Sequence, residues 1–363
     1  MAEKLFSPEA LMMWTKNLWL AAGSSPQEAS LTADHLIGAN LAGHDSHGIG
    51  MVPRYVNSFL ADELQLNQRV SIATDANAII AVDGKRGMGQ AVAFEAMNVA
   101  IDRARQHGVC VMGLKNSHHL GRVGHWAEQA VRHAMVSIHF TNAVSNPSVA
   151  PHGGKEPRFV TNPFTVGIPR QGLEPMILDF ATSNIAHGKV RVAYNKGVPV
   201  PANSLIDAQG NPTNDPGVLF EPVDGKYGAL VTAGAHKGYA LAMVCELLGA
   251  ALTGGETTTP EHRFAVHGVW NNMLTIVFDP NRLGQMASFE TQAREFVAWV
   301  QSSALAPGHS EILMPGDPER AYRKARASGI TIDHETIAQL DEAANLINQK
   351  QGSTLPAISL ITL

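Results

Sequence analysis

Two short stretches of the sequence concentrate side chains that could carry out chemistry. One runs from residue 43 to residue 50 with the letters GHDSHGIG, and the other from residue 116 to residue 122 with the letters NSHHLGR. Histidine titrates near neutral pH, and glycine lets a ligand approach the backbone closely. The two stretches therefore suit proton transfer to a bound ligand, with His47 and His119 as the best candidates for the general acid or base.

The same histidines allow a second interpretation. His44 and His47, together with His118 and His119, could supply nitrogen ligands to a metal ion, so a metal-dependent hydrolase is an alternative function. No H-E-x-x-H motif accompanies them, and the 2 cysteines lie far apart in the sequence. The chain has 16 histidines, so any one of them taken alone is more commonly structural or at the surface. No metal site is predicted.

Two further stretches could contact an anionic ligand. Lys237 and Gly238 stand at the start of an apolar segment, where a cation and a bare backbone N–H would both attract phosphate. The letters DFATS at residues 179–183 could contact a ribose and a pyrophosphate. A solvated lysine and a simple strand end with a helix cap are the structural alternatives, and both stay open.

Helix signals place the first histidine stretch at a helix end. Ser7 and Ser25 are each followed by proline, which is typical of an N-cap and the first helical residue. Gly23 is expected to stop the first helix, and the second runs through Ile37. The DSHG letters at 45–48 then fall just past that second helix, where side chains can face a cleft.

Periodicity predicts the remaining elements. Helices are expected near residues 53–64, 90–107, 122–133, 234–249, 289–300 and 318–328 and after an N-cap at Asp333, and strands near residues 79–84, 109–114, 136–140, 164–168, 175–180 and 273–278. The region from 141 to 235 is expected to form loops and short strands, including the strands near 164–168 and 175–180. The tail from Gly352 is expected to be loosely ordered.

Composition bounds the class of protein. The chain has 363 residues, of which 45% are hydrophobic and 16% charged, so it can bury a large core. A net charge of −5 without a basic run argues against nucleic acid as a partner. No stretch has the ~18 apolar residues of a membrane span or a signal-peptide pattern. With 2 cysteines, Cys110 and Cys245, we expect a reduced cytoplasmic protein that acts on a small molecule.

Three glycines suggest a dinucleotide fingerprint that fails in detail. Gly84, Gly87 and Gly89 lie between a predicted strand and a predicted helix, as in the G-x-G-x-x-G motif. However, Val92 stands where the third small residue belongs, and no acidic residue follows the next strand to hold a ribose. A structural turn is favoured over a Rossmann site.

Taken together, the motifs resemble a known family. They are DSHG at 45–48, DGKRGMGQ at 83–90, NSHHLG at 116–121, TNP at 161–163, LDFATS at 178–183, GKV at 188–190, HKGYALA at 236–242 and LMPGDPE at 313–319. In this order they resemble the malate/L-lactate dehydrogenase family, which includes ureidoglycolate and diketogulonate dehydrogenases and is distinct from the Rossmann-type enzymes. HDSHGIGM, NSHHLGR and NKGVPVPA at 195–202 are most similar to hydroxycarboxylate dehydrogenases acting on larger 2-oxo acids.

The resemblance implies a fold and an activity. The fold is of the α+β class, with a non-Rossmann NAD(P)-binding domain that contains a large mixed β-sheet, beside a helical domain built from both chain ends. We place the helical domain at residues 1–75 and 300–363 and the NAD(P)-binding domain at residues 76–299. The activity is reversible, NAD- or NADP-dependent oxidation of a 2-hydroxy acid to a 2-oxo acid, and the family is typically a homodimer.

The resemblance also implies roles for single residues. His119 is favoured as the proton carrier with His47 close behind, and Ser46 would help to orient the substrate oxygen. The implied cofactor contacts are Ser145, Asn162, Asp179, Phe180, Ala181, Lys237, Gly238, Gly316 and Asp317.

One position departs from the family pattern. Many members have an arginine four residues after the DSHG histidine to bind the substrate carboxylate, and this chain has Met51. Arg122 and Arg54 are the replacements to test, and a surface arginine is the alternative for each. Because methionine packs adaptably, Met51 favours a 2-oxo acid bulkier than pyruvate. A catalytically idle homologue that only binds ligands is a third hypothesis, disfavoured by the intact histidines.

Overall fold

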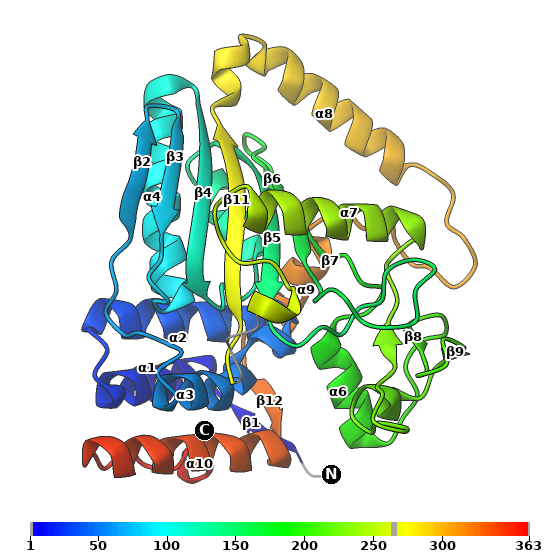
Figure 1. The fold of residues 1–363 in the computed structure, drawn as a ribbon. Coiled ribbons are helices and arrows are strands. Elements are labelled where there is room, and N and C mark those ends of the chain that lie inside the picture. Colours follow the sequence, from blue (N-terminus) through cyan, green and yellow to red (C-terminus); the bar gives the residue numbers. More distant parts are fainter. Residues whose placement is uncertain (1–2, 263–266, 362–363) are drawn as a thin grey trace.

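A seven-stranded mixed sheet forms the centre of the molecule (Figure 1). The computed structural model describes residues 3–262 and 267–361. The strands, in spatial order, are β2 (Ser71–Ala76), β3 (Ile79–Asp83), β4 (Val109–His118), β11 (Trp270–Phe278), β5 (Val136–Val144), β6 (Pro163–Ile168) and β7 (Met176–Ala181). Only the β3–β4 pair is parallel. A doubly wound Rossmann sheet is parallel, so the predicted non-Rossmann α+β fold is confirmed.

Helices cover both faces of this sheet. α4 (Gly89–His107) and α5 (Gly124–Val131) pack on one face, and α7 (His236–Glu246) with the π-helical turn Leu247–Ala251 packs on the other. Alanines and valines of α4 form a core with apolar side chains of β3, β4 and β11. The β4 strand is longer than predicted, so it ends at His118 and leaves His119 as the first residue beyond the sheet.

The two ends of the chain pack together in a second layer. It contains α1 (Pro8–Ala22), α2 (Pro26–Leu41), α3 (Val52–Leu60) and α10 (His334–Gln351), which share one core (Figure 1). The predicted caps are confirmed: Ser7 accepts from the N–H of Ala10, Ser25 from that of Glu28 and Asp333 from that of Thr336.

The ends also contain features that periodicity did not predict. β1 (Glu3–Phe6) pairs antiparallel with β12 (Ile330–Asp333), although Glu3 and its partner Asp333 are 330 positions apart in the chain. The tail from Gly352 was expected to be loosely ordered, and that expectation is wrong for the described residues up to 361. Ile358 is fully buried, and the Trp14 indole donates to the carbonyl of Pro356. The two domain boundaries stay predictions.

The middle of the chain forms a smaller lobe. It contains α6 (His187–Lys196) and the short strands β8 (Leu205–Ile206), β9 (Pro212–Thr213) and β10 (Ala229–Leu230). The expectation of loops and short strands between residues 141 and 235 is wrong at α6. This helix buries only Val190 and has no side-chain cap. It therefore lacks the apolar stripe and the capping residue from which a helix is predicted in a sequence.

Two helices near the C-terminus complete the fold. α8 (Met286–Gln301) extends away from the sheet as an arm, and α9 (Asp317–Ala325) returns to the body (Figure 1). The arm exposes Phe296 and Trp299, with 67% and 75% of their surface accessible. Among the described residues, no helix is long and apolar enough to span a bilayer. Both cysteines are free and buried.

Candidate active site

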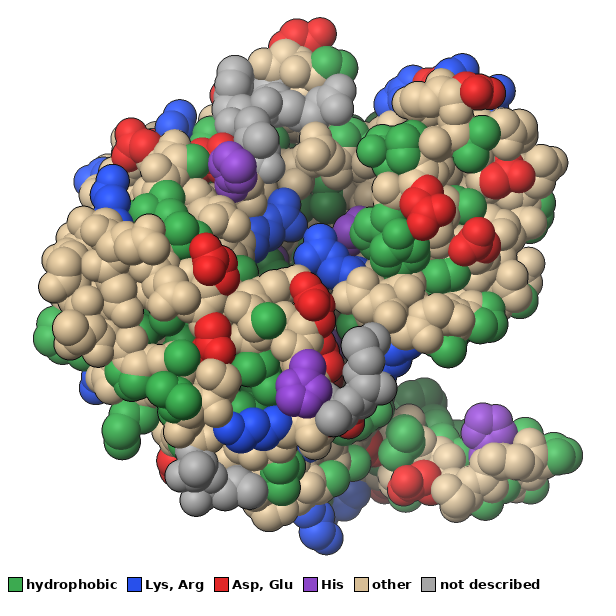
Figure 2. All heavy atoms as spheres, turned by 90° about the horizontal axis from the view of Figure 1, so that it is seen from below, with side chains coloured by type: hydrophobic (Ala, Val, Ile, Leu, Met, Phe, Trp, Pro, Cys, Tyr) green, Lys and Arg blue, Asp and Glu red, His purple; other side chains and the backbone are tan. Residues whose placement is uncertain are grey.

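A cleft of about 2780 Å³ separates the smaller lobe from the helical layer. Figure 2 shows Lys and Arg side chains gathered in this hollow. Several of the sequence-predicted site residues line it: Ser46, His47, His119, Arg122, Ser145, Asp179, Phe180 and Ala181. The cleft therefore brings together both histidine stretches and part of the predicted cofactor set, from the end of α2, the end of β4 and the end of β7.

The DSHG stretch forms a tight turn that Asn40 holds from inside. Residues Asp45–His47 make one 3-10 turn after α2. The Asn40 amide donates to Asp45 at 2.7 Å, and its oxygen accepts from the N–H of Ile49 at 2.7 Å. A Cβ at Gly48 would lie 2.2 Å from the Asn40 oxygen, so only glycine fits at this position.

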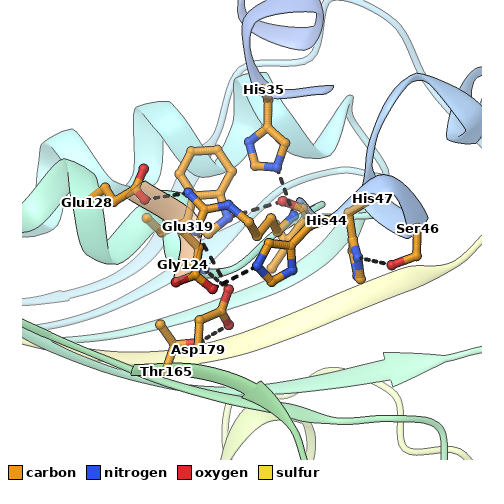
Figure 3. Close-up of polar contacts among 12 residues, drawn as sticks. His35, His44, Ser46, His47, Gly124, Glu128, Thr165, Asp179 and Glu319 are labelled. Carbon is orange, nitrogen blue, oxygen red and sulfur yellow. Dashed lines mark hydrogen bonds and ion pairs between the residues drawn. The ribbon is translucent and has the colours of Figure 1, made fainter. Parts of the chain in front are cut away.

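Helix α9 holds the same turn from outside. The Arg326 guanidinium, which follows α9, donates to both carboxylate oxygens of Asp45 at 2.7 and 2.9 Å. His44 lies 3.0 Å from Glu319, a contact visible in Figure 3. These contacts join residues more than 270 positions apart in the chain, so the C-terminal segment helps to position the predicted catalytic turn.

His47 and His119 stack on each other at the cleft. Their ring centroids are 5.6 Å apart and the ring planes differ by 21°. Nδ1 of His47 lies 3.0 Å from the hydroxyl of Ser46 (Figure 3). Burial lowers the pKa of His47 to about 4, and burial and the neighbouring His47 lower the pKa of His119 well below its usual range. Both imidazoles are therefore neutral at pH 7 before any anionic ligand binds.

His119 has a buried partner that the sequence did not suggest. The phenol of Tyr55 lies 2.6 Å from Nδ1 of His119, and the amide of Gln90 donates to that phenol at 3.1 Å. Burial raises the pKa of Tyr55 well above its usual range, so the phenol keeps its proton. Tyr55 sits at an apolar position of α3 and looks like core from sequence alone. Gln90 ends the DGKRGMGQ motif, which was the one available signal.

The four histidines of the metal alternative do not converge. His118 is fully buried and shares a hydrogen bond with Ser58 at 3.1 Å, and burial lowers its pKa to about 3. His44 is paired with Glu319, away from His119. Within residues 3–262 and 267–361, no group of three or more His, Cys, Asp and Glu side chains is placed to hold a metal ion. The hydrolase alternative required these four histidines as ligands of one metal ion, and their positions do not support it.

Arg122, one of the two arginines suggested for the substrate carboxylate, is bound within the protein. It is 3% exposed and pairs with Glu128 at 2.6 Å. Its Nη1 lies 4.0 Å from Asp179 and has no hydrogen-bond partner. The Asp179 carboxylate also accepts from Thr165 and from the N–H of Gly124, both at 2.8 Å. Arg122 thus joins α5 to the end of β7 under the cleft.

Arg54, the other suggested arginine, has N–H donors that no protein group accepts from among the described residues. Its Nε and Nη2 donate to the carbonyls of His267 and Gly268 and to the Ser145 hydroxyl, at 2.9 to 3.0 Å. Its Nη1 has no hydrogen-bond partner among the described residues, and the side chain lines the cleft beside Met51. Burial and the charge of Arg191 lower the pKa of Arg54.

The first turns of α6 add basic groups to the opposite wall. Arg191 makes no ion pair with any described residue and lines the cleft together with His187. Burial and the charges of Arg191 and Arg54 lower the pKa of His187 to about 4. Gly188 lies against the catalytic turn: a Cβ there would be 2.4 Å from that of Ser46. The sequence placed Gly188 in the GKV motif, but His187 and Arg191 were not predicted because the helix itself was not predicted.

The other predicted cofactor residues lie off the cleft wall. Asn162 is fully buried and donates to Glu246 at 2.6 Å. Lys237 is exposed at the start of α7, and Gly238 packs against the carbonyl of Ala233. Gly316 and Asp317 begin α9, where Asp317 is paired with Arg320. None of these five is among the cleft-lining residues.

Comparison with known proteins gives one consistent result. The model of the malate/L-lactate dehydrogenase family matches residues 6–341. The chain is 44% identical over 348 residues to hydroxycarboxylate dehydrogenase B of Escherichia coli O157:H7, covering 95% of each protein. It is 36% identical to an L-lactate dehydrogenase of Cupriavidus necator, covering 91% of this chain and 94% of that one. The solved sulfolactate dehydrogenase of Methanocaldococcus jannaschii superposes with a TM-score of 0.83 at 31% identity, over 97% of this chain and 98% of the other.

Proposed function

The chain belongs to the malate/L-lactate dehydrogenase family and is a 2-hydroxyacid dehydrogenase, and on that premise we propose its cofactor and substrate. The cofactor is NAD or NADP. The substrate pair is a 2-hydroxycarboxylic acid with an aromatic or otherwise bulky side chain and the corresponding 2-oxo acid. The observation that carries this proposal is the stacked pair His47 and His119, whose rings share one cleft with an arginine that has an unpaired Nη1.

The chemistry divides between the cofactor and the chain. When bound, a nicotinamide would supply the hydride chemistry, taking a hydride from C2 of the hydroxy acid or giving one to C2 of the oxo acid. The chain's own task is the proton: an imidazole takes it from the hydroxyl group during oxidation and returns it to the carbonyl oxygen during reduction. His47, His119 and Ser46 stand together for this task, and both ring systems are partly hidden from water.

The residues present fit a dinucleotide. The cleft volume of about 2780 Å³ exceeds the ~300–1,000 Å³ of a typical small-ligand pocket, which leaves room for a cofactor and an acid together. Lys155, Arg158 and Lys226 line the same cleft and can face phosphate charge. We assign Ser145, Asp179, Phe180 and Ala181 to the cofactor. The same assignment for Lys237, Gly238, Gly316 and Asp317 requires the cofactor to extend beyond the cleft. Asn162 is buried on Glu246, so its effect on cofactor binding would be indirect, through that glutamate.

Arg54 is the best placed residue for the substrate carboxylate. Its Nη1 is free, and the three hydrogen bonds made by its other nitrogens hold the guanidinium in place. Arg191 lies across the cleft, so a carboxylate at Arg54 meets positive charge from both walls, while the neutral His187 can offer only a hydrogen bond. Met51 occupies the position of the usual family arginine and leaves an apolar surface for a larger side chain.

A homodimer is the proposed assembly. The outer faces of α7 and of its π-helical turn expose Val244, Leu247 and Leu252, and the projecting arm α8 exposes Phe296 and Trp299. Large apolar patches on a soluble protein mark interaction sites, and a two-fold axis lets the same two patches serve both copies. Sedimentation equilibrium should give twice 38.8 kDa, and a Phe296→Glu, Trp299→Glu variant should sediment as a monomer. A monomeric wild type would refute the assembly.

The direct experiment on function is an activity panel. Purified protein is incubated with NADH or NADPH and a series of 2-oxo acids from pyruvate and oxaloacetate to phenylpyruvate and branched-chain acids, and loss of reduced cofactor is followed. We expect turnover, with the highest kcat/KM for an acid with a bulky side chain. Turnover of small acids only would contradict the substrate class, and no turnover with either cofactor would contradict the function.

A further inference from the structure

A buried hydrogen-bond chain runs from Gln90 through Tyr55 to His119. Gln90 and Tyr55 are 1% and 0% exposed, and neither lines the cleft. The Gln90 Nε2 lies 3.3 Å from the carbonyl oxygen of His119 and 3.1 Å from the Tyr55 phenol oxygen. That phenol oxygen lies 2.6 Å from Nδ1 of His119. The chain therefore reaches the imidazole from the side opposite the cleft.

The carbonyl of His119 settles which way the Gln90 amide points. A carbonyl oxygen can only accept a hydrogen bond, so the Gln90 atom next to it must be the NH2 group. An NH2 group has two hydrogens, one for the His119 carbonyl and one for the Tyr55 phenol oxygen. The reversed amide would place two oxygens 3.3 Å apart in a buried site. Gln90 is thus a donor to Tyr55.

The Tyr55 proton then has one destination. Its oxygen already accepts from Gln90, and among the described residues the only other group within hydrogen-bond distance is Nδ1 of His119. If Nδ1 carried a proton, the phenol would accept twice and its own O–H would be buried without an acceptor, which costs ~1–3 kcal/mol. A penalty of that size favours the other tautomer by roughly 5- to 150-fold. Nδ1 is therefore unprotonated, and Nε2 bears the hydrogen of the neutral ring.

We infer that Gln90 is a positioning residue for the reaction: through Tyr55 it fixes His119 as the Nε2–H tautomer, a permanent hydrogen-bond donor to the substrate oxygen. This inference rests on the proposed function only for its catalytic consequence. The tautomer itself is a property of the cofactor-free protein, because Gln90, Tyr55 and the His119 carbonyl all belong to the buried framework beneath the cleft.

The fixed tautomer separates the roles of the two histidines. A neutral ring with hydrogen on Nε2 cannot take the hydroxyl proton there, whereas Nδ1 of His47 faces the rotatable hydroxyl of Ser46, which can donate or accept. In reduction, hydride adds to C2, the carbonyl π pair moves to oxygen, and that oxygen takes the Nε2 proton of His47. His47 must therefore take up a proton when the anionic acid binds, because in the free protein burial lowers its pKa to about 4, and the step leaves it neutral again. His119 donates a hydrogen bond throughout. The proton carrier is thus His47, in contrast to the preference for His119 drawn from the sequence.

The test replaces Gln90 with leucine and measures the tautomer directly. In protein labelled with 15N-histidine, the His119 signals are identified by their absence from His119→Ala. In the wild type we expect Nδ1 of His119 to have the chemical shift of an unprotonated ring nitrogen and Nε2 that of a protonated one. In Gln90→Leu the phenol oxygen is free to accept, so the two tautomers mix.

The kinetics of Gln90→Leu give a second readout. Its kcat should fall about 10–100-fold, which is less than the ~10²–10³-fold loss for removing an oxyanion donor outright, and its KM should stay within about twofold of the wild type.

Gln129→Leu is the matched control. Gln129 is 3% exposed and donates to the carbonyl of Phe94 at 3.2 Å and to Asn98 at 2.8 Å, so it makes as many bonds in an equally buried place. The Gln129→Leu variant should lose as much stability as Gln90→Leu, but its His119 15N chemical shifts and its kcat should match those of the wild type. A wild-type His119 protonated at Nδ1, or a Gln90→Leu protein with unchanged shifts, would overturn the inference whatever the substrate proves to be.

Discussion

At the scale of single residues, His47 and His119 differ in the hydrogen-bond partner of their Nδ1 atom. Ser46 can turn its hydroxyl to suit either protonation state of His47, while Tyr55 offers His119 only a donor. Sequence alone identified both histidines because small and polar neighbours surround each. It could not separate their roles, because the separation depends on Tyr55 and Gln90, which come from two other helices and resemble core residues in sequence.

Arg54 provides the residue-scale prediction. Arg54→Ala should raise KM for the 2-oxo acid by about 10–100-fold, since a hydrogen bond to a charged group contributes roughly 1.5–3 kcal/mol. KM for the reduced cofactor should stay within about twofold in steady-state assays. Arg191→Ala removes an exposed charge without an internal partner and should raise the same KM by a smaller factor. An Arg54→Ala enzyme with the wild-type KM for the acid would remove Arg54 from carboxylate binding.

At the scale of elements, the catalytic turn lies between helices from distant parts of the chain. Asn40 of α2 and Arg326 after α9 hold its backbone and Asp45, and α6 presses on Ser46 through Gly188. Capping signals predicted α2 and α10 correctly because these are local. The α6 helix was missed because it has no side-chain cap and no buried apolar stripe, and the β1–β12 pair because its strands lie more than 320 positions apart in the chain.

Gly188 supplies the element-scale prediction. In Gly188→Ala the new Cβ must displace Ser46, since the built position lies 2.4 Å from the serine Cβ. We expect kcat/KM to fall by roughly 10–100-fold, the order of loss that a misplacement of about 1 Å produces. Gly38→Ala in α2 is the control, because a Cβ there meets nothing within 4 Å. It should keep full activity and gain about 0.5–1 kcal/mol of stability. Equal activity of the two variants would contradict the packing of α6 on the turn.

At the scale of the whole molecule, the fold buries several neutral histidines. His118 and His139 are fully buried against hydroxyl groups, and burial lowers the pKa of each to about 3. The overall class, a mixed sheet covered by helices, followed from the family resemblance. Which histidines would be buried did not, because strands β4 and β5 carry them on inward faces that only the sheet register defines.

These histidines make stability depend on pH. An unfolded histidine takes a proton near pH 6.5, and the buried ones resist until about pH 3, so between these values the unfolded state binds more protons. Stability is therefore full above about pH 6.5 and is lost as pH falls, by roughly 1–2 kcal/mol per buried histidine at pH 5. Urea titrations at pH 7.5 and pH 5 measure the loss. His139→Gln should flatten the dependence and the exposed His309→Gln should not, and an equal free energy of unfolding at both pH values would contradict this account.

The most direct measurement of the central claim compares wild type, His47→Ala and His119→Ala in the same reaction. With the best 2-oxo acid of the panel and saturating NADH or NADPH, hydride transfer is followed as the loss of reduced cofactor in a single turnover. Loss of the proton carrier should slow this step by ~10²–10⁴-fold in His47→Ala. Loss of the fixed donor should slow it by ~10²–10³-fold in His119→Ala. A wild-type rate in either variant, with the protein folded and the cofactor bound, would show that this histidine is not part of the catalytic site.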